Sequence, residues 1–316
     1  MKALTFSTFG GPEVLEYKDI PDPVLKEGEV LVELKAIGLN YADIYRRRGN
    51  YHLAGAPPYI NGYEGAGVVV DANGVDDVYT GDRVAFADVP FANAELVAVA
   101  YEHLIPLPDR ISFEVAASSL LQGLTAQYLT RDSYKIKTEE TVLVHACAGG
   151  VGQLLVQICK AKDAYVIGLT SSHEKKGVAL NLGADEVWLY NENWPGELKN
   201  KNVSVVYDSA GETILQSLQV VKEGGTVVFF GFAAGNPPCI DPRILMDGSK
   251  TLTGGDLWTF LNSRDDRIMK SAELFEWIER GFISVAPSAT FALSDGANAH
   301  RFLESRNSTG KIILIP

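Results

Sequence analysis

A glycine-rich turn at Ala146–Gly152 has the clearest chemical meaning in this sequence. It reads Ala-Cys-Ala-Gly-Gly-Val-Gly, directly after the apolar run Val142–Val144 and directly before apolar residues at helical spacing. Small residues let the backbone approach a pyrophosphate, and a helix N-terminus supplies free N–H groups and a positive dipole. Three glycines also weaken the start of a helix, so a purely structural turn is the less favoured explanation. We predict a dinucleotide site here.

The residues after the next predicted strand, 165–169, indicate which dinucleotide binds. An NAD site usually places Asp or Glu about twenty residues after the turn, on the ribose 2′-hydroxyl. Residues 170–176 read Thr-Ser-Ser-His-Glu-Lys-Lys instead, so hydroxyl groups and two lysines replace the acid. Such donors suit a 2′-phosphate, and we predict NADPH. The alternative is that Lys175 and Lys176 are solvated residues in the first turn of a helix. The neighbouring acid Glu174 also reduces the positive charge of this segment.

The elements that must position this turn alternate between strand and helix. Short strands are predicted at 142–144, 165–169, 186–189, 203–207 and 226–230, with helices between them. Alternating βα units of this length are typical of a parallel, doubly wound sheet. The helix through Ile214 and Val221 is predicted to end at Gly224-Gly225.

The first third of the chain has a different pattern. Strands are predicted at 1–6, 30–36, 66–70 and 83–86, between Gly and Pro clusters, which is typical of an antiparallel, barrel-like β domain. Ser112 is the predicted N-cap of a following helix. The tail has a helix through 268–278 and strands at 290–293 and 311–315, and we expect it to complete the first domain. The predicted limits are 1–118 with 262–316 for that domain, and 119–261 for the dinucleotide domain.

Composition narrows the classes of partner. The net charge is −12 and the pI is about 4.9, which disfavours nucleic acid and anionic membranes. The one basic run, Arg46–Arg48, is expected to be a solvated helix end. Three separated cysteines and no visible signal peptide or membrane-spanning run favour a cytoplasmic protein.

Several motifs together resemble the zinc-independent quinone oxidoreductases of the medium-chain dehydrogenase/reductase superfamily, the zeta-crystallin type, over nearly the whole chain. Besides the turn, the motifs are Leu121–Ala126, Asn40–Tyr45 with Gly49 and Tyr51, Gly62–Gly67, Gly81–Val84, Tyr207–Gly211, Phe230-Gly231 and Gly310-Lys311. The resemblance implies an α/β protein: a GroES-like β-rich catalytic domain with an inserted Rossmann doubly wound parallel-sheet domain. It also implies NADPH between the domains and a homodimer formed through a sheet edge near 226–230 or 251–253.

The resemblance further implies roles for individual residues. Thr125 would contact the nicotinamide end, and Lys175 would meet the 2′-phosphate. The pyrophosphate would lie on the backbone of the turn, and other family positions lie beside the adenosine or close over the cofactor. These further cofactor-binding residues are Ala148, Gly149, Gly150, Val151, Gly152, Ser171, Ser172, Tyr190, Gly231 and Phe232.

No metal is expected. The zinc alcohol dehydrogenases of the same superfamily have Cys and His ligands where this chain has Asn40 and Tyr63, and no Cys or His occurs at 121–126. Catalytic zinc needs about three protein ligands. The lobe with four cysteines that binds structural zinc is also missing, because no cysteine lies between Asp82 and Pro106.

Without a metal, the acceptor must itself be electrophilic. A quinone or conjugated enone spreads incoming charge over its π-system, so positioning for hydride transfer is the main requirement. Asn40 is a candidate hydrogen-bond donor to the acceptor oxygen. Tyr45 and Tyr51 are candidate proton donors, or simply line the site.

Three functions remain open at this point. Quinone reduction is favoured. Reduction of the C=C bond of an enone, alkenal or acyl thioester by an enoyl reductase is second, because the motifs are shared. The third is an NADPH-binding protein with a structural or RNA-associated role, which the acidic composition disfavours.

Overall fold

The computed structural model describes all 316 residues, which form two compact units. The β-rich unit combines Met1–Leu121 with Leu261–Pro316, and the α/β unit is Gln122–Phe260. The boundaries between the units therefore fall after residues 121 and 260, whereas the sequence predicts them after residues 118 and 261. The two units are described separately below.

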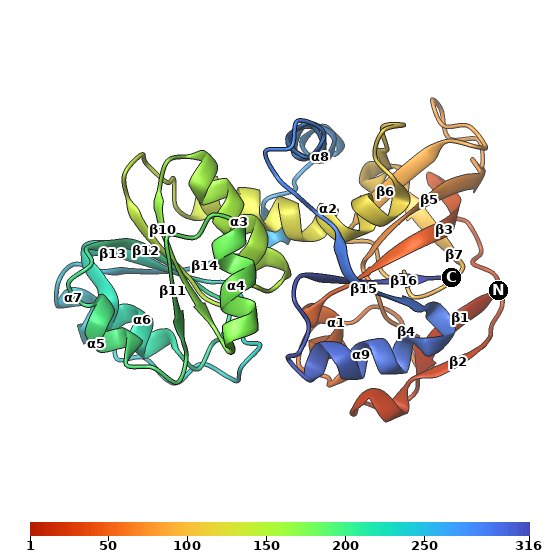
Figure 1. Cartoon of the computed structure of the whole chain (residues 1–316). Helices are drawn as coiled ribbons and strands as arrows, with labels where there is room; N and C mark the ends of the chain where they lie inside the picture. Colours follow the sequence, from red (N-terminus) through yellow and green to blue (C-terminus); the bar gives the residue numbers. More distant parts are fainter. The chain divides into compact units, whose positions relative to one another are not determined.

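The α/β unit is built on a six-stranded parallel sheet in the order β11-β10-β9-β12-β13-β14 (Figure 1). The strands are β9 (Thr141–Val144), β10 (Tyr165–Thr170), β11 (Glu186–Leu189), β12 (Val203–Asp208), β13 (Val221–Phe229) and β14 (Thr251–Gly254). The predicted doubly wound sheet is therefore confirmed. Because β10 and β12 flank β9 on opposite sides, the strand order reverses there, and ligands bind at the carboxyl ends of strands at such a point.

Helices cover both faces of this sheet (Figure 1). They are α3 (Gly150–Ala161), α4 (His173–Asn181), α5 (Trp194–Leu198), α6 (Ile214–Val220) and the short α7 (Arg243–Met246), with a π-helical turn at Leu129–Ser133 and a 3-10 turn at Leu257–Thr259. Val142, Leu143 and Val144 are fully buried, as expected for a parallel strand covered on both faces.

Helix α6 is shorter than predicted. It ends at Val220, and β13 begins at Val221, which pairs with Val203 of β12. The β-branched pair Val220-Val221 favours extended backbone. The predicted stop at Gly224-Gly225 lies within β13, where Gly224 has a φ of +69°.

The β-rich unit contains two sheets, and the tail of the chain joins the larger one. That sheet has the order β15-β16-β3-β5-β6-β8 with β7 also paired to β3, and the smaller has the order β2-β1-β4. The strands are β1 (Lys2–Phe6), β2 (Glu16–Asp19), β3 (Glu29–Leu39), β4 (Tyr59–Ile60), β5 (Glu64–Asp71), β6 (Arg83–Ala87), β7 (Leu96–Ala100), β8 (Ile105–Pro106), β15 (Pro287–Ala292) and β16 (Lys311–Ile315). Strand β16 pairs antiparallel with β3, with Ile312 opposite Leu39. Lys311 is thereby brought beside Asn40.

The helices of this unit are α1 (Tyr41–Arg47), α2 (Phe113–Tyr128), α8 (Arg264–Glu279) and α9 (Gly296–Glu304), with 3-10 turns at Pro12–Val14, Tyr101–His103 and Leu293–Asp295. Helix α2 continues into the α/β unit after Leu121. Ser112 precedes α2, and its hydroxyl accepts the Val115 N–H at 3.2 Å, as an N-cap does.

The expectation that Arg46–Arg48 is a solvated helix end is wrong for two of its three residues. Arg46 and Arg47 are buried, with 1% and 0% of their surface exposed. Arg47 donates to the Gly10 carbonyl, to His300 Nδ1 at 2.9 Å and to Glu304 at 2.6 Å. These bonds tie α1 to α9, because a buried guanidinium must find partners for its donors.

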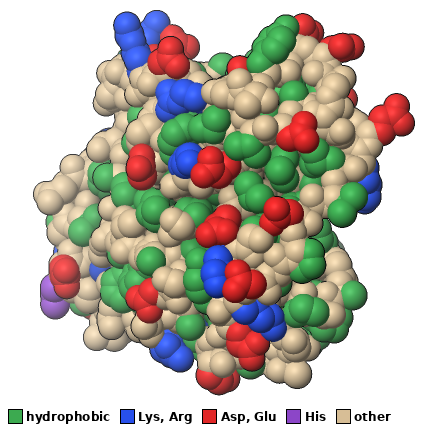
Figure 2. Space-filling view, turned by 90° about the vertical axis from the view of Figure 1, so that its right-hand side faces the viewer, with side chains coloured by type: hydrophobic (Ala, Val, Ile, Leu, Met, Phe, Trp, Pro, Cys, Tyr) green, Lys and Arg blue, Asp and Glu red, His purple; other side chains and the backbone are tan.

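The surface has mixed charge, and no helix is both long and apolar enough to cross a membrane. On the face in Figure 2, Lys and Arg side chains lie among Asp and Glu and form no continuous basic area.

Because His300 is buried beside Arg47, its protonation should govern part of the acid sensitivity of the β-rich unit. Burial, and then the Arg47 charge, lower the pKa of His300 to about 3. The unfolded chain therefore binds this proton below about pH 6.5 while the folded protein does not, so stability falls as pH falls from about 6.5 toward 3, by up to about 1.4 kcal/mol per pH unit. We expect His300→Asn, whose amide oxygen can accept from Arg47, to reduce the loss of melting temperature between pH 7 and pH 4.5.

The exposed His173 offers a control, and His173→Asn should keep the wild-type pH dependence of melting. Equal pH dependence in wild type and His300→Asn would contradict the assignment.

Candidate functional site

The glycine-rich turn follows β9 and is held by a tyrosine from the end of β11. Ala146 has a left-handed backbone, with a φ of +47°, and its N–H donates to the Tyr190 hydroxyl at 2.9 Å. The Ala146 carbonyl accepts the Gly149 N–H at 2.8 Å. Gly149 then caps α3, which starts at Gly150. The turn is therefore fixed at both of its ends.

Close packing explains two of the glycines. A Cβ at Gly152 would collide with the Ala146 carbonyl, and one at Gly150 would collide with the Gln122 side chain. The first turn of α3 is thus pressed against the residues that follow β9 and against α2, and its free N–H groups lie at the carboxyl end of β9. This is the arrangement that binds a pyrophosphate.

A buried polar network lies behind the turn. Tyr190 OH is 3.3 Å from His145 Nδ1, and Ser217 Oγ is 3.0 Å from His145 Nε2. Asp208 accepts from Ser217 at 2.7 Å and from Thr213 at 2.8 Å. Burial lowers the pKa of His145, which keeps the ring neutral. Burial opposes ionisation of Asp208, but His145 and the hydrogen bonds outweigh it and lower the pKa of Asp208. The network ties β9, β12 and α6 to Tyr190 and hence to the turn.

The structure brings the other predicted cofactor residues to the same edge of the sheet. Ser171 and Ser172 follow β10, and Ser172 caps α4 by accepting the Lys175 N–H at 3.3 Å. Gly231 and Phe232 follow β13 and pack on the loop after β12, where a Cβ on Gly211 would press against Phe232. Thr125 lies on α2, three residues after the Gln122 that covers Gly150.

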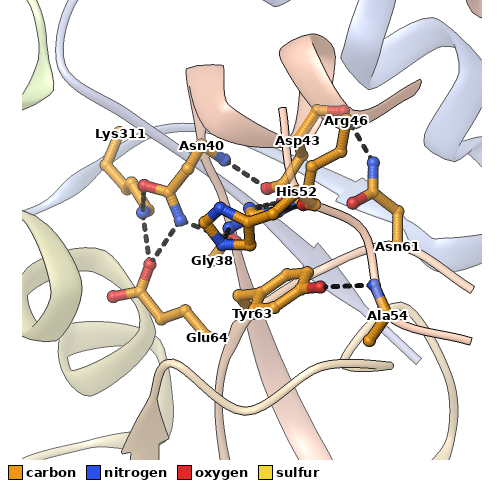
Figure 3. A network of polar contacts seen from close by, with 10 residues as sticks. All are labelled: Gly38, Asn40, Asp43, Arg46, His52, Ala54, Asn61, Tyr63, Glu64 and Lys311. Carbon is orange, nitrogen blue, oxygen red and sulfur yellow. Dashed lines mark hydrogen bonds and ion pairs between the residues drawn. The ribbon is translucent and has the colours of Figure 1, made fainter. Parts of the chain in front are cut away.

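In the β-rich unit, Asn40, Glu64 and Lys311 form a buried cluster from three segments (Figure 3). Lys311 Nζ lies 2.5 Å from Glu64 Oε2 and 2.7 Å from Asn40 Oδ1. Asn40 Nδ2 donates to Glu64 at 2.8 Å and to the Gly38 carbonyl at 3.3 Å. The ammonium and the carboxylate neutralise each other, so each can be buried.

Glu64 also contacts helix α2. Its Oε1 accepts the Leu121 N–H at 2.7 Å, at the last residue of the β-rich unit. A Cβ on Gly38 would collide with the Glu64 carboxylate and the Ala117 carbonyl, so the glycine lets β3 approach both. In the sequence, Glu64 and Lys311 stand out only as members of the family motifs Gly62–Gly67 and Gly310-Lys311. Each is a charged residue at the start of an apolar strand, and that was the available signal.

A second buried cation lies beside this cluster. The Arg46 guanidinium carbon is 3.5 Å from the centre of the Tyr63 ring, and Arg46 Nη1 donates to Asp43 at 3.1 Å (Figure 3). Burial raises the pKa of Asp43, and Arg46 and the Asn40 N–H offset this only in part. Arg46 also donates from Nε to the His52 carbonyl at 3.1 Å and lies 3.3 Å from His52 Nε2. The sequence pattern did not single out His52, and it marked Arg46 only as part of the basic run Arg46–Arg48.

The three predicted catalytic residues lie close together in the fold. Tyr45 and Tyr51 are half-buried with ring centres 6.4 Å apart, and Asn40 caps the helix that carries Tyr45. Asn40 has only 5% of its surface exposed. Its amide hydrogens point to Gly38 and Glu64, so donation to an acceptor oxygen requires one of these bonds to be exchanged.

The side chains at the zinc-ligand positions of the superfamily do not fit zinc here. Asn40 faces an ammonium group, and Tyr63 accepts the Ala54 N–H at 3.0 Å with its ring against a guanidinium. Both side chains are thus engaged with groups of the protein itself, and neither an amide nor a phenol is among the ligands that zinc usually takes. No group of three or more His, Cys, Asp or Glu side chains is arranged to hold one.

Comparison with known proteins agrees with this geometry. Residues 26–137 match the alcohol dehydrogenase GroES-like domain, and residues 150–270 match the family described as zinc-binding dehydrogenase. A quinone oxidoreductase of Pseudomonas aeruginosa is 41% identical over 100% of this chain and 99% of its own. The solved structure of Escherichia coli quinone oxidoreductase complexed with NADPH is 37% identical, covers 100% of both chains and has a TM-score of 0.95. A 2-haloacrylate reductase of a Burkholderia species is 33% identical over 97% of this chain and 96% of its own.

The fold and the two domain matches define a medium-chain dehydrogenase/reductase. Within that superfamily, the chain belongs to the quinone oxidoreductase family. The predicted resemblance and the predicted GroES-like and Rossmann architecture are confirmed.

The buried ion pair of Lys311 and Glu64 should be far more important for stability than an exposed pair. Lys311→Met leaves the Glu64 carboxylate buried without its partner, which should cost about 3–5 kcal/mol of unfolding free energy. Lys35→Met breaks the exposed 2.8 Å pair with Glu33 and should cost less than about 1 kcal/mol. Urea unfolding of the two variants measures the difference, and equal effects would show that the buried pair is not needed.

Proposed function

We propose that the chain is an NADPH-dependent quinone oxidoreductase that needs no metal. The observation that carries the proposal is the pairing of a dinucleotide turn in one unit with Asn40 and Tyr63 at the zinc-ligand positions of the other. Both features accompany full-length similarity to proteins named quinone oxidoreductase.

The residues of the α/β unit fit NADPH. Backbone N–H groups at Ala148–Gly152 would hold the pyrophosphate, with Gly152 leaving the space that this requires. No acid stands at the end of β10, where Thr170 is followed by Ser171 and Ser172. Lys175 would supply positive charge to the 2′-phosphate. When bound, the cofactor supplies a hydride. Thr125 would contact its nicotinamide end, and Gly231 and Phe232 would close over the cofactor.

The β-rich unit would supply the acceptor site. The rings of Tyr45 and Tyr51 offer faces on which a flat acceptor can stack. Positioning is the main task of these residues, since a quinone is already electrophilic. Asn40 and the two tyrosines stay our candidates for contact with the acceptor, with a tyrosine as donor or as lining.

Reduction of a conjugated C=C bond is the second candidate. It is favoured by the similarity to the protein named 2-haloacrylate reductase, and the same charge-spreading argument applies to an enone. An RNA-associated role is disfavoured by the net charge of −12.

We further propose a cytoplasmic homodimer. All three cysteines are free thiols, which fits a reducing compartment. Of the two segments considered for a dimer edge, β13 is paired on both sides, while β14 is the last strand of its sheet. Strand β14 is therefore the segment on which a second copy can extend the sheet.

The activity is tested by following oxidation of NADPH and NADH with a simple quinone and with a small enone. We expect the highest kcat/KM with NADPH and the quinone. A higher kcat/KM for the enone would favour C=C reduction, and no oxidation with either acceptor would contradict both enzymatic candidates.

The cofactor assignment is tested by Lys175→Ala. Loss of a charged donor to the 2′-phosphate should cost about 1.5–3 kcal/mol, so the preference for NADPH over NADH in kcat/KM should fall about tenfold or more. Lys176→Ala, one residue further along α4, is the matched control and should change the preference little. An unchanged preference in Lys175→Ala would refute the role.

A further inference from the structure

A row of aromatic rings crosses the β-rich unit beside the two buried cations. The ring centres are 6.4 Å apart for Tyr45 and Tyr51, 4.1 Å for Tyr51 and His52, and 6.1 Å for His52 and Tyr63. Tyr63 is buried, whereas Tyr45 and Tyr51 are half-buried and His52 is exposed. Along the row from Tyr45, the His52 imidazole is therefore the last ring that solvent can reach before the buried Tyr63.

The tautomer of this imidazole is set by Arg46. A guanidinium has only donors, so the 3.3 Å contact from Arg46 Nη2 makes His52 Nε2 the acceptor. The ring is then neutral and carries its hydrogen on Nδ1. Because Arg46 Nε also binds the His52 carbonyl at 3.1 Å, the same group holds both the backbone and the ring of His52.

Arg46 is itself fixed in place. Its Nη1 donates to the buried Asp43 at 3.1 Å, its guanidinium stacks on Tyr63, and only 1% of its surface is exposed. It can therefore orient a neighbour but is too buried to reach an acceptor. Figure 3 shows Arg46 with Asp43, Tyr63 and His52.

From this geometry we infer that His52 Nδ1–H is the hydrogen-bond donor to the acceptor oxygen, and that Arg46 is its positioning residue. The inference rests on the proposed reduction of a quinone or enone by NADPH. The hydride brings two electrons and forms a new bond to the acceptor, the π bond breaks, and negative charge collects on the conjugated oxygen. His52 stabilises that charge as a neutral donor, in the way that preorganised donors stabilise oxyanions.

His52 does not give up its proton in this scheme. A neutral imidazole could lose the Nδ1 proton only if Nε2 gained one, and Nε2 faces a guanidinium that does not release protons. The reduced acceptor therefore takes its proton from water, either directly or through one of the two tyrosines, which completes the balance of one hydride and one proton for each acceptor reduced.

The decisive variants are His52→Leu, which removes the donor, and His52→Asn, whose amide nitrogen can take the place of Nδ1. Where the negative charge is poorly delocalised, removal of a single hydrogen-bond donor to an oxyanion lowers kcat by about 10²–10³-fold. For a quinone, which delocalises the charge, we expect His52→Leu to lower kcat about tenfold, with a larger loss for an enone. His52→Asn should stay within about threefold of wild type, with the KM for NADPH unchanged in both.

Asn50→Leu is the matched control, because Asn50 lies exposed on the same segment and should leave kcat unchanged. Arg46→Lys keeps a cation beside Asp43 but loses the fork that holds His52. It should lower kcat in the wild-type background and have no further effect in the His52→Leu background, because Arg46 acts through His52. Melting curves check that each variant is folded.

The inference is overturned if His52→Leu keeps the wild-type kcat, if His52→Asn loses as much as His52→Leu, or if the effects of Arg46→Lys and His52→Leu simply add. Wild-type protein that oxidises no NADPH with either acceptor would instead overturn the proposed function, and the inference with it. The wild-type assay therefore separates the two failures.

Discussion

The buried carboxylate of Glu64 is the constraint around which the β-rich unit is organised. One oxygen takes the Lys311 ammonium and the Asn40 amide, and the other takes a backbone N–H of helix α2. Four segments far apart in the sequence thus share one charge. An isolated buried carboxylate would be prohibitively costly, so β16 must pair with β3 in the register that delivers Lys311. The antiparallel pairing of the C-terminal strand is therefore an electrostatic requirement as well as a packing one.

In the α/β unit, the main structural constraint is that the glycine-rich turn Ala146–Gly152 must be held in one shape. Glycines give the turn room but no rigidity. Rigidity comes from the Tyr190 hydroxyl on the Ala146 N–H, and Tyr190 is in turn held by the neutral His145 and by Ser217 and Asp208 behind it. Such networks work only when every member is satisfied. The glycine-rich turn is therefore held in one shape by polar residues that lie behind it.

Local sequence signals predicted the elements of the α/β unit well, but they predicted the interior of the β-rich unit only in part. The strands and helices around the turn follow from apolar periodicity and caps, and β11 and β16 have the limits expected. Helix α6 was predicted too long because two glycines were given more weight than the β-branched Val220-Val221. The burial of Arg46 and Arg47 was missed, since their partners Asp43, Tyr63, His300 and Glu304 come together only through tertiary contacts. A run of three arginines offers no local sign that two of them are internal.

The electrostatic character of the region around Asn40 and Tyr63 follows from two buried ion pairs. Glu64 neutralises Lys311, and Asp43 neutralises Arg46. Neither cation can therefore stabilise negative charge on a substrate in the way that a metal ion does. A site built this way cannot replace the Lewis acid that a plain ketone requires. It can offer aromatic faces and neutral hydrogen-bond donors, which suffice when the acceptor spreads the charge over its own π-system. Asn40 and Tyr63 at the zinc-ligand positions are therefore accompanied by a pairing of the surrounding charges, and such surroundings suit the conjugated acceptors of the proposed function better than a plain ketone.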